Sequence, residues 1–290
     1  MSLLRAAVEG WDPAPVTSTT RVHAEPATAF AALLDQPAPV SADGDPLPPA
    51  WHWFTFLDRP ATADLGDDGH PRAGHFLPPV PHRRRMIAGG RLEQTAPLRI
   101  GAEVTRTSTL ASRAVKEGRS GEMLFVTVRS EYREADRPLL TEEQDLVYRS
   151  QPPGAPRTPA AEAPPAPEDD GPAVELLPDA PLLFRFSALT YNAHRIHYDL
   201  PYATDVEGHA GLVVHGPLLA LLLLEVPRRA HPGRAVTSFG YRLTRPAYAG
   251  TPVRARGSLD DDRLELSAAV EGRAPSIAGT ARLAPPGGTR

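Results

Sequence analysis

The sequence contains no cysteine, a single lysine and no apolar run long enough to cross a membrane. The absence of cysteine excludes disulfide bonds and thiolate chemistry and fits a reducing compartment. A membrane-spanning helix needs about 20 apolar residues, whereas the longest apolar run, residues 211–226, is interrupted by His215, Gly216 and Glu225. The N-terminus lacks the pattern of a signal peptide. We therefore expect a cytoplasmic protein without a membrane partner.

An excess of either charge is also absent. The 31 lysine and arginine residues and the 35 aspartate and glutamate residues give a formal net charge of −4 over 290 residues. No polybasic surface follows from this balance, so we expect no nucleic-acid partner. The hydrophobic fraction of 41% and the charged fraction of 23% are those of an ordinary soluble globular protein.

Proline is abundant, with 34 residues, and it is concentrated in one segment. Residues 151–172, QPPGAPRTPAAEAPPAPEDDGP, bury little and favour an extended linker. The chain is therefore predicted to consist of an N-terminal part, residues 1–150, the linker, residues 151–172, and a C-terminal part, residues 173–290. Each part has the size of a single domain.

The two parts share an outline of one helix followed by strands. In the first part we expect a helix at 27–34 and strands at 90–93, 102–111, 122–132 and 142–150. In the second part we expect a helix at 217–226 and strands at 235–244, 252–259, 263–271 and 276–283. The second helix is apolar nearly all round, so other elements must enclose it. The predicted fold is α+β, a double hot-dog in which two antiparallel sheets each wrap around a central helix.

A dense polar cluster lies in the C-terminal part. It consists of Tyr191, Asn192, His194, Arg195 and His197, and His215-Gly216-Pro217 then begins the apolar helix. Removal of water from a 3-hydroxyacyl thioester needs a base, an acid and fixed donors for the enolate oxygen. Two imidazoles and the N–H groups at a helix N-terminus can supply these functions. The cluster therefore indicates an active site for proton transfer beside a thioester.

The cluster resembles the MaoC-like, R-specific enoyl-thioester hydratases, whose motif runs D-x-N-P-[LIV]-H and is followed by an H-G pair at the start of the central helix. On this resemblance His197 takes the place of the motif histidine and His194 that of the asparagine. The H-G pair corresponds to His215 and Gly216. Asn192 stands where the motif has aspartate, and an amide cannot act as a base at neutral pH.

One branch of this family also has asparagine at the position of Asn192. The string LTYNAHRIHYD is similar to the branch of mesaconyl-C4-CoA hydratases and mitochondrial-type 3-hydroxyacyl-thioester dehydratases, which itself carries N-x-H-R-I-H-Y-D. In the N-terminal part, WHWFTFLD at 51–58, RRRMIAGGRLE at 83–93 and EEQDLVYR at 142–149 resemble its hallmarks. Ile87 departs from the aromatic residue expected there.

The resemblance implies a hydro-lyase that adds or removes water across the α,β bond of an acyl thioester. One active site is expected in the C-terminal repeat, and the non-catalytic N-terminal repeat is expected to supply half of the substrate tunnel. The substrate is expected to be a thioester of CoA or of an acyl carrier protein, with a mesaconyl-type acyl group among the candidates. No cofactor is implied, and a homodimer is a candidate assembly. The expected catalytic residues are His197, Asn192, His194 and Gly216, and the expected substrate-binding residues are Tyr191, Arg195, His215, Arg85 and Gly89.

Other interpretations of the same residues stay open. His194, His197 and Asp199 are types that bind metal, but no metal-binding signature is matched, so no metal site is expected. The basic run 83–85 favours either a solvated surface or attraction of substrate phosphates. Gly89 and Gly90 favour a strand bulge or a close backbone approach. A non-catalytic acyl-thioester or carrier-protein binding module and a hot-dog thioesterase are the alternative functions.

Overall fold

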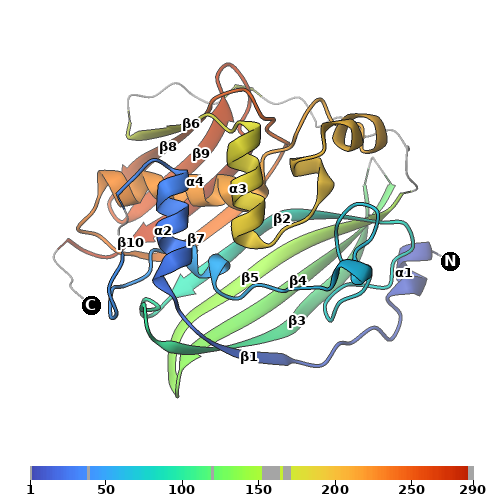
Figure 1. The fold of residues 1–290 in the computed structure, drawn as a ribbon, viewed down its shortest axis with the longest axis horizontal. Helices are drawn as coiled ribbons and strands as arrows, with labels where there is room; N and C mark the ends of the chain where they lie inside the picture. The colour runs from blue at the N-terminus through green and yellow to red at the C-terminus, as the bar shows by residue number, and fades with distance from the viewer. Residues whose placement is uncertain (1, 38–39, 119–120, 152–163, 166–170, 287–290) are drawn as a thin grey trace.

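A computed structural model describes residues 2–37, 40–118, 121–151, 164–165 and 171–286. Within these residues ten strands form one continuous antiparallel sheet with the order β1-β3-β4-β5-β2-β7-β10-β9-β8-β6 (Figure 1). Most of the predicted linker lies outside the described residues, so its role stays a prediction. In the described part of the chain, no helix combines the length and the apolar character that crossing a membrane demands.

The N-terminal half supplies one end of the sheet. Its strands are β1 (Val16–Arg21), β2 (Arg83–Gln94), β3 (Glu103–Gly118), β4 (Gly121–Glu134) and β5 (Arg137–Ser150). Its helices are α1 (Leu3–Ala7), α2 (Ala24–Leu33) and the short 3-10 turns η1 (Trp51–Phe54) and η2 (Thr62–Asp64). The four strands predicted here correspond to β2, β3, β4 and β5, and each observed strand is longer than predicted.

The C-terminal half supplies the other end. Its strands are β6 (Ala173–Leu176), β7 (Val236–Leu243), β8 (Val253–Asp260), β9 (Arg263–Val270) and β10 (Ile277–Leu283). Its helical elements are α3 (Ala180–Thr190), the 3-10 turn η3 (Arg195–His197), the π-helical turn η4 (Tyr202–Val206) and α4 (Gly216–Ala230). The predicted apolar helix is α4, and the four predicted strands correspond to β7 through β10.

The central helix α4 is enclosed as its composition requires. Every residue from Leu218 to Pro227 is buried, and the helix packs against strands β6 to β10 (Figure 1). The one acidic residue in this stretch, Glu225, accepts hydrogen bonds from Arg228 and Arg229 at the end of the helix. This pairing removes the cost of an isolated buried carboxylate.

The helix of the N-terminal half has a different environment. Helix α2 packs against α3 and η1 rather than lying along a sheet of its own, and α2 and α3 stand side by side in Figure 1. Phe30 of α2 contacts Phe54 and, at 6.3 Å between ring centroids, Phe186 of α3. The two halves therefore share one hydrophobic core.

The two sheets expected from the sequence are joined edge to edge by β2 and β7. Gly89 pairs with Arg242 and Gly90 pairs with Tyr241 across this junction. A bulge lies between Ile87 and Gly89, and a Cβ atom on Gly89 would lie 2.3 Å from the carbonyl oxygen of Tyr241. The bulge and the close approach predicted at the glycine pair are both present. The bulge lies in the pairing of β2 with β5, and the close approach is to strand β7.

Candidate active site

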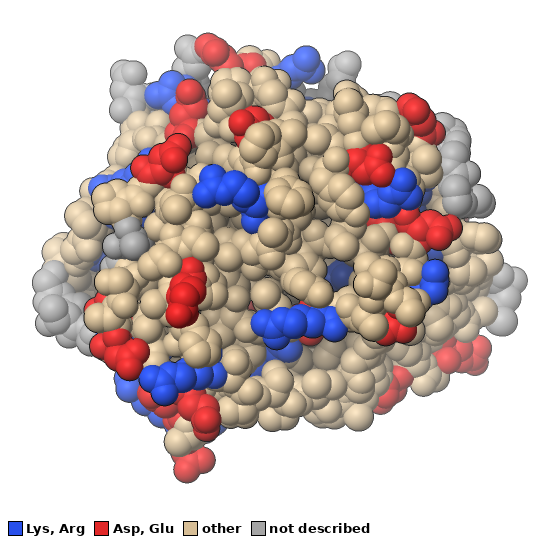
Figure 2. All heavy atoms as spheres, viewed as in Figure 1, with Lys and Arg blue, Asp and Glu red and all other residues tan. Residues whose placement is uncertain are grey.

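A cavity of about 960 Å³ lies between the two halves. On the face drawn in Figure 2, neutral atoms surround a recess in which basic atoms are visible. The cavity contains all four residues that were expected to be catalytic and residues from the N-terminal half. The lining residues used below are Trp53, Asp68, His70, Arg85, Asn192, His194, His197 and Gly216.

The end of α3 positions the catalytic loop, which we define as residues 191–199. Tyr191 ends the helix in the left-handed conformation with φ 52°, a common way to close a helix. The N–H of Asn192 then donates to the carbonyl oxygen of Ser187 at 2.9 Å. The chain turns away from the helix axis there and enters η3, which carries His197 into the cavity.

His197 is held as a neutral imidazole with one nitrogen available. Its Nδ1 lies 2.7 Å from the carbonyl oxygen of Val213, and a carbonyl can only accept a hydrogen bond, so Nδ1 carries the hydrogen. Nε2 therefore keeps its lone pair. Burial lowers the pKa of His197 to about 4, so the ring is uncharged at neutral pH. A neutral ring with a free lone pair is the form that a proton acceptor needs.

His215 supports His197 from behind. Its ring is fully buried and stacks on the His197 ring with 3.6 Å between centroids. Its Nε2 lies 2.9 Å from the hydroxyl oxygen of Ser187, and burial lowers its pKa well below the ordinary value. His215 was expected to contact the substrate, but it is not among the residues that line the cavity. Its position fits a role in fixing the plane of the His197 ring.

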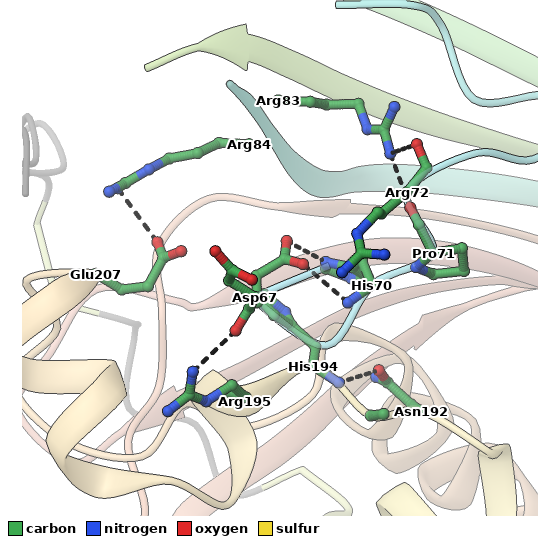
Figure 3. A network of polar contacts seen from close by, with 12 residues as sticks. Asp67, His70, Pro71, Arg72, Arg83, Arg84, Asn192, His194, Arg195 and Glu207 are labelled. Atoms are coloured by element: carbon green, nitrogen blue, oxygen red, sulfur yellow. Dashed lines mark hydrogen bonds and ion pairs between the residues drawn. The ribbon is translucent and has the colours of Figure 1, made fainter. Parts of the chain in front are cut away.

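Asn192 and His194 form a tight turn beside His197. The side-chain oxygen of Asn192 accepts the backbone N–H of His194 at 3.0 Å, which leaves the side-chain NH₂ as a donor (Figure 3). The His194 ring lies 5.4 Å from the His197 ring. Burial, with the neighbouring His70 and His197, lowers the pKa of His194 well below its ordinary value. The pair can therefore donate hydrogen bonds but is a poor source of positive charge.

Gly216 opens α4 at the wall of the cavity. The first N–H groups of a helix have no partner within the helix, and the helix dipole makes this end positive. A Cβ atom on Gly216 would lie 2.5 Å from Cδ1 of Leu243, so a larger residue would crowd this wall. The arrangement offers a backbone donor to an oxygen atom in the cavity.

The other predicted substrate-binding residues differ in position. Arg85 and Tyr191 line the cavity. Gly89 lies at the β2–β7 junction, outside the lining residues. Arg195 is also outside the lining; its guanidinium donates to Asp199 at 2.8 and 2.9 Å and to the carbonyl oxygen of Asp67 at 2.9 Å. Arg195 therefore ties the catalytic loop to the N-terminal half. Asp199 also accepts the backbone N–H of Tyr202 at the start of η4 at 3.1 Å, so it caps this turn.

Two residues of the cavity, Asp68 and His70, were not predicted from the sequence. Asp68 and His70 line the cavity and form a hydrogen-bonded pair. The only signal available was the Asp-x-His spacing within GDDGHP, which carries no periodicity and is common in loops. The catalytic loop that they contact lies more than 120 residues away in the chain, so no local pattern could predict the contact.

Metal-binding types gather at one point. Asp68, His70 and His194 each place a potential ligand atom within 4.8 Å of the others. The set considered from the sequence is not assembled, because Asp199 pairs with Arg195. Both oxygens of Asp68 accept hydrogen bonds from His70, one from the backbone N–H and one from Nδ1. We interpret this group as a hydrogen-bonded pair, and the expectation of no metal stays a prediction.

Comparison with known sequences identifies close relatives. Residues 50–249 match the family described as hydroxyacyl-thioester dehydratase type 2. The chain is 44% identical over 257 residues to the mesaconyl-C(4)-CoA hydratase of Chloroflexus aurantiacus, and the match covers 89% of this chain and 91% of that protein. The resemblance inferred from the motif and from the N-terminal strings is thereby confirmed.

Comparison with solved structures confirms the fold. A MaoC-like dehydratase from Phytophthora capsici superposes with a TM-score of 0.69 at 15% identity, over 96% of this chain and 97% of that chain. A protein of Mycobacterium tuberculosis that is described as having a double hotdog fold superposes with a TM-score of 0.55 at 13% identity, over 94% and 96% of the two chains. The double hot-dog architecture expected from the sequence is therefore present.

Proposed function

The chain belongs to the hydroxyacyl-thioester dehydratase type 2 family, and from this premise we propose how its cavity performs the reaction and on which substrate. It is a hydro-lyase that acts on acyl thioesters. We propose that the substrate is a CoA thioester and that His197, Asn192, His194 and Gly216 handle the reacting atoms. The free Nε2 of His197 in the cavity wall is the observation that carries this proposal.

The first step concerns the hydrogen on the α-carbon. In the direction of dehydration, Nε2 of His197 takes the α-proton and the C–H electron pair moves into the enolate. The hydrogen bond from Nδ1 to the carbonyl oxygen of Val213 holds the tautomer that makes this possible. In hydration the same nitrogen returns the proton to the α-carbon.

The enolate oxygen needs a fixed donor while it carries negative charge. The N–H of Gly216 and the positive end of α4 supply it in a part of the cavity wall that also contains Val214 and Leu243. Loss of a single donor of this kind typically slows an enzyme by roughly 10²–10³-fold.

The β-hydroxyl is held by Asn192 of the catalytic loop. The NH₂ group of Asn192 is free to donate to the oxygen of the hydroxyl or of the attacking water, because its own oxygen is used by the N–H of His194. His194 assists by fixing the orientation of that amide. Asn192 cannot give or take a proton, so this assignment makes it a binding group.

Arg85 supports a substrate with a negative group. It lines the cavity, its buried Nε has no hydrogen-bond partner, and no ion pair joins it to any described residue. Its neighbours in the basic run differ, because Arg84 pairs with Glu207 and Arg83 donates to the carbonyl oxygens of Pro71 and Arg72. The mesaconyl-type acyl group carries a carboxylate, which Arg85 could receive as a charge-assisted pair.

The test is an absorbance assay for the α,β double bond with crotonyl-CoA and a mesaconyl-type CoA thioester. We expect the wild type to hydrate at least one of them and His197→Gln to lose about 10²-fold or more in kcat. His23→Gln is the matched control, because His23 is exposed and outside the cavity. Arg85→Met should raise KM for the carboxylate-bearing thioester more than for crotonyl-CoA. Wild-type turnover by His197→Gln would contradict the assignment.

The alternative functions give different readouts in the same assay. A thioesterase would release free thiol, which a disulfide dye reports, with no change in the double-bond absorbance. A binding module would bind butyryl-CoA in a titration but turn over neither substrate. A parallel assay with a crotonyl carrier-protein thioester separates CoA from the carrier protein as the natural partner.

Three finer proposals concern the setting of the enzyme. We propose a cytoplasmic location, supported by the absence of cysteine. A role in fatty acid metabolism is supported by the type of thioester named for the family. A homodimer stays a prediction, which a measurement of molar mass in solution tests directly.

A further inference from the structure

A loop of the N-terminal half is clamped onto the catalytic loop. We call residues 66–71 the Asp68 loop. The N–H of Arg195 donates to the carbonyl oxygen of Asp68 at 2.9 Å, and the Arg195 guanidinium donates to that of Asp67 (Figure 3). Gly69 has φ +86°, and a Cβ atom there would lie 1.8 Å from the carbonyl oxygen of Ala193. The two backbones are therefore in direct contact, and only glycine fits.

Within this loop, Asp68 fixes the orientation of His70. One oxygen of Asp68 accepts the backbone N–H of His70 at 2.9 Å, and the other lies 3.0 Å from its Nδ1. Burial by itself raises the pKa of Asp68, but the hydrogen bonds and charge of His70 outweigh it, so the pKa is lowered overall. An ionised carboxylate takes the hydrogen on Nδ1, which leaves Nε2 as the nitrogen that exchanges a proton.

His70 lies within a row of imidazoles that crosses the junction between the halves. Its ring is 3.9 Å from the His194 ring, and the His194 ring is 5.4 Å from the His197 ring. All three residues line the same cavity. The charged groups that face this row are Asp68 from its own loop and Arg83 and Arg85 from β2.

The three imidazoles differ in how they would tolerate a positive charge. His197 has a backbone carbonyl on Nδ1 and no carboxylate, and the ring of His194 lies among other imidazoles. His70 alone in this row is hydrogen-bonded to a carboxylate. A carboxylate behind an imidazole stabilises the imidazolium that forms when the ring accepts a proton. Chemistry at the β-carbon needs such a group, because Asn192 cannot supply a proton.

We propose that His70, oriented by Asp68, is the second proton-transfer group of the active site, so that the N-terminal half contributes a catalytic residue. The proposal rests on the proposed function, because it assigns the acid and base for the β-oxygen in that reaction. His70 would thus take over the proton-transfer role of the motif aspartate, whose place in this chain is occupied by Asn192.

The step balances as follows for dehydration. Nε2 of protonated His70 gives its proton to the β-hydroxyl, the C–O bond breaks, and the enolate electrons form the α,β double bond as water leaves. His197 has taken the α-proton from the substrate, and His70 has given a proton to the departing hydroxyl. After the reaction His197 is protonated and His70 is neutral. In hydration His70 takes a proton from water while the oxygen attacks the β-carbon, and His197 protonates the α-carbon.

The experiment uses His70→Ala with added imidazole in the crotonyl-CoA assay. We expect kcat to fall by about 10²-fold or more, while the Kd for unreactive butyryl-CoA changes less than about threefold. Imidazole fits a cavity of this size and should restore part of kcat in proportion to its concentration. Asp68→Asn is the second variant; it should lower kcat, because Nδ1 of His70 loses its carboxylate partner, again with unchanged butyryl-CoA binding.

The matched control is His52→Gln. His52 forms the same type of pair, with Glu142, but lies outside the cavity lining, so its loss should lower stability and imidazole should not change kcat. Unchanged kcat in His70→Ala, or a loss that imidazole does not restore, overturns the proposal. Loss of wild-type activity in a chelator, with recovery on Zn²⁺, also overturns it in favour of a metal centre. An inactive wild type would instead reject the proposed function.

Discussion

Among the described residues of the N-terminal half there are two histidine–carboxylate pairs, one buried in the core and one lining the cavity. His52 and Glu142 are 2.9 Å apart, with 3% and 6% of their side chains exposed. His70 and Asp68 are 3.0 Å apart, with 19% and 25% exposed, and face the cavity. The two pairs have the same chemistry and nearly the same length. Their environment therefore decides what each can do.

The first pair is fully satisfied. Glu142 accepts hydrogen bonds from His52, from the indole N–H of Trp53 at 2.7 Å and from the hydroxyl of Tyr132 at 3.1 Å. Burial alone raises the pKa of Glu142, but these partners outweigh it and lower the pKa overall. A carboxylate with this many donors holds the core together and has no capacity left for a substrate. The second pair keeps one imidazole nitrogen on the cavity side, and only such a pair can move a proton to a ligand.

The largest expected effect is on stability at the first pair. Glu142→Ala leaves the donors of His52, Trp53 and Tyr132 buried without an acceptor, so the free energy of unfolding should fall by about 3–5 kcal/mol. Asp68→Ala, at the partly exposed pair, should cost no more than about 1 kcal/mol. Urea unfolding of both variants measures the difference. Equal losses would show that the two pairs do not differ as described.

The next effect is on the pH dependence of stability at His197, an imidazole that has no carboxylate partner. The pKa of His197 is lowered to about 4 in the folded state and is near 6.5 in the unfolded chain. Between these values the unfolded chain binds the extra proton, so stability rises with pH there and is lost as pH falls from about 6.5 to 4. The loss is at most roughly 3 kcal/mol. Unfolding measured across this range should be less pH-dependent in His197→Gln, and an unchanged slope would contradict this.

The smallest effect concerns the contact between the Asp68 loop and the catalytic loop. Gly69 and Gly44 both have positive φ, at +86° and +89°, but a Cβ atom on Gly44 meets nothing within 4 Å. Gly44→Ala should cost only the backbone strain, about 1–2 kcal/mol, while Gly69→Ala should cost about 1–3 kcal/mol more through the clash with Ala193. Gly69→Ala should also lower kcat, because it moves His70 away from His194. Equal stability and kcat in the two variants would show that the loops are not in contact.

Prediction from sequence succeeded where a local pattern is tied to burial. The strands at 122–132 and 263–271 alternate, and α4 is apolar on all sides, so burial leaves a direct trace in these segments. The catalytic loop was found for a related reason, because its polar residues lie within nine positions of one another.

The missed elements have no such trace. Strand β1, VTSTTR, forms the edge of the sheet and has no buried residue, so nothing apolar marks it. The strand predicted at 90–93 begins at Arg83 in the structure. Its first part was missed because it starts with three arginines and its side chains are at most partly buried. The contact of Asp68 and His70 with the catalytic loop depends on the whole fold and on Gly69, and no segment of the chain encodes it alone.

The pairing of β2 with β7 has a consequence for how this enzyme could evolve. When two identical subunits meet along a strand, every substitution appears on both sides of the interface at once. Here the two edges belong to one polypeptide, so each can change independently of the other. The C-terminal repeat could keep an enclosed helix and the thioester-binding wall, while the N-terminal repeat packed its helix against α3 and gained the Asp68 loop, which contacts the catalytic loop. The two repeats can therefore contribute different residues to one active site, because one polypeptide encodes both.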